Sequence, residues 1–130
     1  MSLWWQQLWL VMLGGALGAG GRYWLGGVLL RHIGSGFPWG TFAVNMLGAF
    51  AGGFLAAWLE GRGQAALYWR AFLIVGLLGG LTTYSALMIE WLLYTRSSRT
   101  ELALLYLVLT LAVGLLLVWS GARIASAWRP

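Results

Sequence analysis

The stretch from Gly76 to Glu90, GLLGGLTTYSALMIE, determines how the rest of this chain is interpreted. It places two adjacent glycines, a run of hydroxyl-bearing residues and one carboxylate inside an otherwise apolar segment. Hydrocarbon offers no water to free backbone groups, so an irregular backbone at membrane depth persists only where protein buries it or where it lines a wet cavity. We therefore predict a helix that is broken near Gly79–Thr83 and that presents carbonyls and hydroxyls to an ion.

The composition around this stretch is that of an integral membrane protein. The 130 residues are 61% hydrophobic and 8% charged, whereas soluble domains carry about 25% charged residues. Four apolar stretches, at about 8–30, 39–59, 71–94 and 102–124, each reach the length of about 20 residues that crosses a bilayer. We predict an all-α membrane protein in which residues 1–130 form a single domain of four transmembrane helices in contact with lipid.

The residue types present exclude several classes of protein. The chain contains no cysteine, aspartate or lysine and only one histidine, so no enzyme constellation and no metal site of the usual His/Cys/carboxylate type is predicted. The net charge of +5 comes from arginines that are scattered singly between apolar stretches. Such arginines are typical of headgroup anchors, so we predict no nucleic-acid partner.

The arginines specify orientation in the membrane only weakly. Four spans would put Arg62, Arg70, Arg123 and Arg129 on one side and Arg22, Arg31, Arg96 and Arg99 on the other. Because an excess of Lys and Arg normally marks the cytoplasmic side, this balance predicts insertion in both orientations, with two opposed copies paired about an axis in the membrane plane. The alternative is that one arginine counts less and a single orientation prevails.

Small and polar residues recur at helical spacing along the first three stretches. Gly14 and Gly18 lead to Arg22, and Gly76 and Gly80 repeat the pattern, as is typical of close helix contacts in lipid. In the second stretch one face carries Thr41, Asn45, Gly48 and Gly52. The Asn45 side chain either makes a hydrogen bond to another helix or directs an N–H donor at an anion.

Two ionisable residues lie within the predicted spans. Charge inside a membrane is costly and by default suggests function. Arg22 is either such a charge or a side chain that snorkels to the interface, while Glu90 shares a helix face with Thr83 and Leu87. In the last stretch, Tyr106 and Thr110 share a face that is either a polar lining or ordinary packing.

Three motifs together resemble the Fluc/CrcB family of bacterial fluoride channels. They are GGALGAGGRY at 14–23, FPWGTFAVNMLGAFAGGF at 37–54 and GLLGGLTTYSALMIE at 76–90. The resemblance covers the first three predicted helices in order and spacing, and the fourth matches only as an apolar span.

The resemblance implies a particular assembly and activity. Members are antiparallel, dual-topology homodimers in the bacterial cytoplasmic (inner) membrane, with two pathways through which fluoride leaves the cell passively. A structural sodium ion lies at the dimer centre, held by backbone carbonyls at the break in the third helix. In this chain those carbonyls would belong to Gly79 and Thr82.

The resemblance also assigns residues to the fluoride pathway. By position these are Asn45, Arg22 and Glu90, with hydroxyls from Thr83 and Ser85. Two positions depart from the family, which usually has two phenylalanines where this chain has Tyr84 and Leu87. Tyrosine keeps an electropositive ring edge, but leucine has no ring to offer an anion.

Two other functions compete with this one. A proton-coupled small multidrug exporter would use Glu90 as its intramembrane carboxylate, although a broken helix rich in hydrogen-bond donors favours a small anion. A subunit of a membrane assembly without transport activity is the third possibility.

Overall fold

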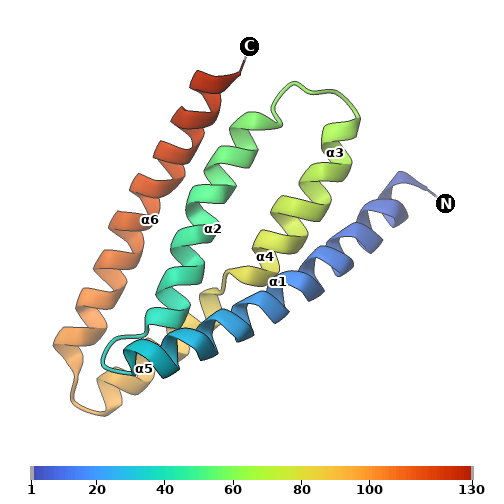
Figure 1. Ribbon diagram of the computed structural model, residues 1–130. Coiled ribbons are helices and arrows are strands. Elements are labelled where there is room, and N and C mark those ends of the chain that lie inside the picture. The colour runs from blue at the N-terminus through green and yellow to red at the C-terminus, as the bar shows by residue number, and fades with distance from the viewer. Residues whose placement is uncertain (1, 130) are drawn as a thin grey trace.

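The computed structural model describes residues 2–129, which are helical almost throughout (Figure 1). The elements in chain order are α1 (Leu3–Ile33), α2 (Trp39–Trp58), α3 (Ala65–Trp69), the π-helix η1 (Arg70–Leu78), α4 (Gly79–Leu81), α5 (Tyr84–Arg96) and α6 (Thr100–Trp128). The first, third and last predicted stretches are extended at both ends, because polar and aromatic residues outside the apolar core continue the helices. Helix α2 instead matches its predicted stretch to within one residue.

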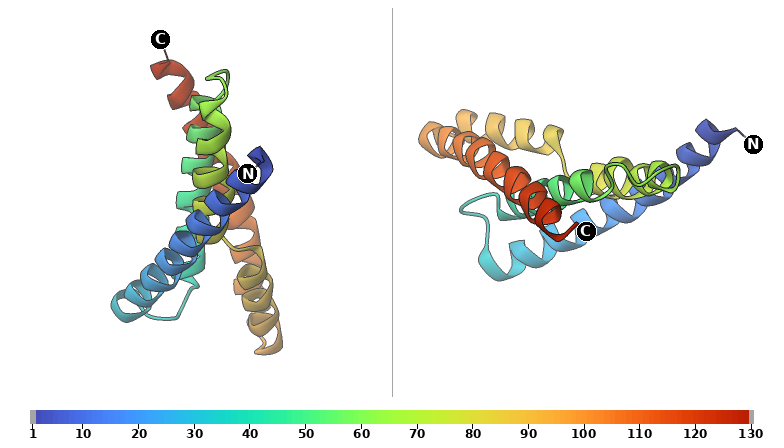
Figure 2. Two further views of the ribbon diagram at one scale, coloured as in Figure 1. Left: turned by 90° about the vertical axis from the view of Figure 1, so that its right-hand side faces the viewer. Right: turned by 90° about the horizontal axis from the view of Figure 1, so that it is seen from above.

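The helices form two packed pairs. Helix α2 runs beside α6, and α1 crosses η1 and α4 (Figures 1 and 2). Helix α5 leaves this arrangement after the break and lies beside the first part of α6. The α1–α2 and α5–α6 loops lie at one end of the molecule, and the α2–α3 loop and the C-terminal end of α6 lie at the other (Figure 1).

Three helical segments are long and apolar enough to cross a membrane, and they make this a multi-pass membrane protein. They are Trp39–Trp58, Ala65–Arg96 and Thr100–Trp128. Helix α1, with 31 residues, has the length but is not among the three, since glycines, tryptophans, glutamines and Arg22 lower its apolar content. The fourth membrane span therefore stays a prediction.

The third segment, Ala65–Arg96, is interrupted as predicted, but its helix does not break at Gly79 or Gly80. Gly79 and Gly80 belong to α4, and the extended residues are Thr82 (φ −85°, ψ 157°) and Thr83 (φ −151°, ψ 121°). The break therefore lies within the predicted range, at its threonine end and not at its glycines. Gly80 packs closely against α1.

Glycines bring α1 into backbone contact with the third segment. A Cβ on Gly14 would lie 2.8 Å from the Leu77 backbone nitrogen, and one on Gly18 would lie 2.7 Å from that of Leu81. From the other side, a Cβ on Gly80 would collide with the backbone of Gly15. The predicted glycine pairs thus mark a real helix contact, which we call the α1 seam.

The helices bury few side chains within one copy of the chain. Tyr106 and Val44 are the largest side chains that are fully buried. Large apolar residues are exposed along every long helix, for example Leu17, Leu47, Ile89 and Leu115. A surface of this kind is typical of a protein covered by lipid or by a second subunit.

Candidate functional site

The extended segment Thr82–Thr83 forms the polar centre of the molecule. Thr83 caps the next helix, because its Oγ1 accepts a hydrogen bond from the Ala86 backbone N–H at 3.1 Å. Threonine is a favoured N-cap residue since its oxygen satisfies a free N–H of the first turn. Thr82 bonds backward instead, donating from Oγ1 to the Leu78 carbonyl at 2.8 Å. The adjacent threonines thus close one helix and start the next.

Asn45 connects α2 to this segment with both ends of its amide. Its Nδ2 donates to the Thr83 carbonyl at 3.1 Å, and its Oδ1 accepts the Thr83 N–H at 2.7 Å. The helix-to-helix hydrogen bond considered for Asn45 is therefore present. A neutral amide carries two N–H donors, so one donor remains beyond this pair.

The break frees backbone carbonyls from their usual helical partners. In an α-helix the Gly79 carbonyl would accept from the N–H of Thr83, and the Thr82 carbonyl from that of Ala86. Here the Thr83 N–H goes to Asn45, and the Ala86 N–H goes to the Thr83 side chain. The two carbonyls predicted to hold a cation are thus among those whose helical donors are engaged elsewhere.

Arg22 is half-buried and bonds to the third segment. Its Nε donates to the Gly80 carbonyl at 3.2 Å, in the same stretch of altered hydrogen bonding. The α1 seam positions it, since Gly18 lies one turn earlier on α1. Whether Arg22 is an intramembrane charge or snorkels to the interface stays a prediction.

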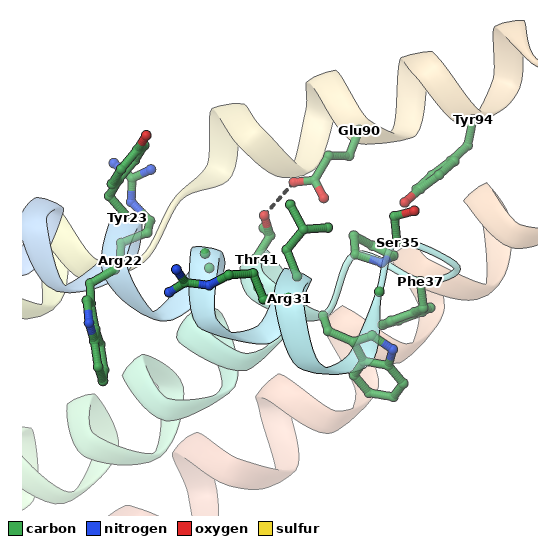
Figure 3. A pocket seen from close by; sticks show the side chains of 16 residues that line it. Arg22, Tyr23, Arg31, Ser35, Phe37, Thr41, Glu90 and Tyr94 are labelled. Carbon is green, nitrogen blue, oxygen red and sulfur yellow. Dashed lines mark hydrogen bonds between the residues drawn. The ribbon is translucent and has the colours of Figure 1, made fainter.

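An open pocket of about 810 Å³ lies beside the break, between the second half of α1, the start of α2 and α5 (Figure 3). Its charged lining residues are Arg22, Arg31 and Glu90. Thr41 donates from Oγ1 to Glu90 Oε1 at 2.5 Å, which ties α2 to α5. The pocket therefore holds two cationic groups and a carboxylate fixed by a hydroxyl.

The predicted pathway residues do not all meet. Thr83 and Asn45 are bonded, and the Thr83 and Ser85 hydroxyls lie 3.4 Å apart. Tyr84 is 76% exposed on the surface of this subunit, whereas Leu87 is 7% exposed and packed inside it. The two positions that depart from the family thus differ in their surroundings.

Some polar residues of the site were not predicted in their actual roles. The sequence placed Thr41 on the Asn45 face, but its bond to Glu90 joins residues 49 apart in the chain. The buried hydroxyls of Tyr106 and Thr110 have no hydrogen-bond partner within residues 2–129. Their four-residue spacing on one face was the available signal, and their unpaired hydroxyls do not fit the alternative of fully satisfied packing.

Comparison with known proteins gives consistent matches over nearly the whole chain. Residues 9–122 match the family described as CrcB-like protein, Camphor Resistance (CrcB). A fluoride-specific ion channel FluC of Xylella fastidiosa (strain 9a5c) is 56% identical over 124 residues, covering 95% of this chain and 87% of the relative. The protein of that name from Xanthomonas euvesicatoria pv. vesicatoria (strain 85-10) is 52% identical over 121 residues, covering 93% and 91%.

A more distant relative shows the same coverage. The fluoride-specific ion channel FluC of Caulobacter sp. (strain K31) is 41% identical over 120 residues, covering 92% of this chain and 94% of the relative. These matches confirm the resemblance predicted from the three motifs, and the chain belongs to the Fluc/CrcB family.

Proposed function

We propose that this chain forms a fluoride-selective channel, not an enzyme, through which fluoride leaves the bacterial cytoplasm passively across the inner membrane. Relatives up to 56% identical are named fluoride-specific ion channels. The observation that carries the proposal is the pairing of Asn45 with Thr83 at a broken helix. It keeps an amide donor and several hydroxyls at membrane depth, where an apolar segment would have none.

The chemistry of the site suits a small anion. A filter must replace the water around an ion with ligands of its own, and fluoride requires hydrogen-bond donors. Asn45 offers an amide N–H, and Thr83, Tyr84 and Ser85 offer hydroxyls along the start of α5. Arg22 and Arg31 in the adjoining pocket offset the charge of Glu90, which Thr41 holds in place.

A structural sodium ion fits the backbone at the break. The Gly79 and Thr82 carbonyls lack their helical donors for the reason given above, and carbonyl oxygens are suitable ligands for a hard cation. Each subunit would supply two such oxygens, so the ion would need both subunits of a homodimer. When bound, the cation would add positive charge near the pathway and lower the cost of anion entry.

The opposed arrangement of the two subunits leads to a prediction about topology. The chain has no cysteine, so single cysteines can report on each side. In Ser2→Cys and Gly36→Cys, a membrane-impermeant thiol reagent applied to intact inverted vesicles should label about half of the protein, because balanced arginines direct about half of the copies each way. Gly36 is open to substitution, since a Cβ there meets nothing within 4 Å.

The two positions serve as controls for each other. A single orientation with four spans would give complete labelling at one position and none at the other, and that result would reject dual topology.

Fluoride efflux from liposomes that contain the purified protein alone tests the proposed function. A fluoride electrode should record release that needs no proton gradient and requires only a counter-ion path. Proton release driven by an organic cation, abolished in Glu90→Gln, would instead support the multidrug exporter. No flux of either kind would support the assembly subunit.

The family usually has a phenylalanine where this chain has Leu87, and we expect that restoring it changes fluoride efflux little. Leu87 is packed inside the subunit, so Leu87→Phe adds volume to a filled site, which costs about 1–3 kcal/mol of stability, and offers no new donor. We expect fluoride efflux to change by less than about threefold, because amide and hydroxyl donors replace the ion's water.

Tyr84→Phe is the paired variant, because it removes a hydroxyl from an exposed ring and keeps the ring edge. A large gain of efflux in Leu87→Phe would show that ring edges dominate at this site.

A further inference from the structure

Arg31 is the charged residue of the pocket whose side chain makes no hydrogen bond within residues 2–129. The other two charged groups are engaged, since Arg22 donates to the Gly80 carbonyl and Glu90 accepts from Thr41. Arg31 lies in the last turn of α1 and is exposed, yet it lines the same pocket. Figure 3 shows its guanidinium on the α1 side of the pocket, across from Glu90 on α5.

The position of Arg31 is near the mouth of the pocket. The C-terminal end of α1 and the α1–α2 loop lie at one end of the molecule (Figure 1). Gly34, Ser35 and Phe37 of that loop also line the pocket, whereas Arg22 lies nine residues deeper along α1. An anion that enters from this end passes Arg31 before it reaches Arg22.

We propose that Arg31 gathers small anions at the pocket mouth and so sets the supply of fluoride to the pathway. The inference rests on the proposed channel function. A charge on the wall of a cleft raises the local concentration of counter-ions. A unit charge about 8 Å from the ion in water raises that concentration about twofold. The Debye length falls from about 30 Å at 0.01 M salt to about 3 Å at 1 M, so added salt should remove the effect.

Fluoride current across planar bilayers tests this role, with ionic strength adjusted by an impermeant salt. At about 10 mM ionic strength, Arg31→Gln should lower the current about twofold and Arg31→Glu about fourfold, while Arg31→Lys should keep it. At 1 M the four proteins should agree within about 20%, because screening removes the attraction.

The matched control is Arg96→Gln. Arg96 lies in the last turn of α5, is exposed at the same end of the molecule and does not line the pocket. It should have less than half the effect of Arg31→Gln. An equal effect would assign the change to surface charge in general and overturn the role of Arg31, as would a reduction that persists at 1 M.

Failure of the inference differs from failure of the proposed function. A wild-type protein that carries fluoride current, with Arg31→Gln unchanged at every ionic strength, would overturn the inference alone. A wild-type protein without any fluoride current would overturn the channel and, with it, this role of Arg31.

Discussion

Gly18→Ala should destabilise the folded protein more than a glycine-to-alanine change at an open position of α1. The added methyl group would lie 2.7 Å from the backbone nitrogen of Leu81 and would collide with the carbonyl of Leu77. Backbone atoms cannot move aside by changing rotamer, so α1 would have to separate from the third segment. Overpacking typically costs about 1–3 kcal/mol of stability. A loss of about 1–2 kcal/mol lowers the ratio of folded to unfolded protein about 5- to 30-fold. The yield of monodisperse protein from size-exclusion chromatography in detergent measures the effect.

Gly20→Ala is the control for this experiment. Gly20 lies two residues further along α1, and a Cβ there meets nothing within 4 Å. Alanine favours the helix over glycine by up to about 1 kcal/mol, so this variant should be as stable as the wild type or more so. Equal yields of Gly18→Ala and Gly20→Ala would contradict the close approach of α1 to the third segment.

The α1 seam also shows how far the sequence predicts the fold. Glycines four residues apart predicted close contacts, and Gly14, Gly18 and Gly80 make them. The four apolar stretches predicted helices, and the glycine pair with the hydroxyl residues after it predicted the break. These features are local, because each depends on residues within one or two turns of helix or on a cap.

Features that depend on packing between segments were not predictable in this way. Residues Arg70–Leu78 form a π-helix, whose i→i+5 bonding leaves no distinctive pattern in an apolar run. Gly79 and Gly80 are helical, and α1 packs directly on Gly80, although glycine alone weakens a helix.

The candidate site divides in the same manner. The spacing of Thr41 and Asn45 predicted one polar face of α2. It did not predict that this face bonds to Thr83 at the break and to Glu90 in α5. The burial of Leu87 and the exposure of Tyr84 follow from where the Thr83 cap restarts the helix. A shift of that start by one residue would rotate both side chains by about 100°.

Asn45→Asp should abolish most fluoride efflux. Aspartate has nearly the same volume and can still accept the Thr83 N–H, but it loses the donor to the Thr83 carbonyl and brings an acceptor within about 3.1 Å of it. Its charge would also oppose an anion: two like charges about 4 Å apart repel by about 4 kcal/mol at an effective dielectric of 20. Each 1.36 kcal/mol corresponds to a tenfold change in rate, so we expect efflux to fall by about 100-fold or more.

The fold should survive this change better than the flux, because Gly48 and Gly52 also hold α2 against the third segment through Thr82 and Leu78. Size-exclusion elution in detergent should therefore match the wild type while efflux is lost. Gln64→Glu is the control, since it makes the same amide-to-carboxylate change in an exposed loop and should leave efflux unchanged. Wild-type efflux from Asn45→Asp would give the amide a packing role alone, and loss of the assembled protein together with efflux would make Asn45 chiefly a structural tie between α2 and the break.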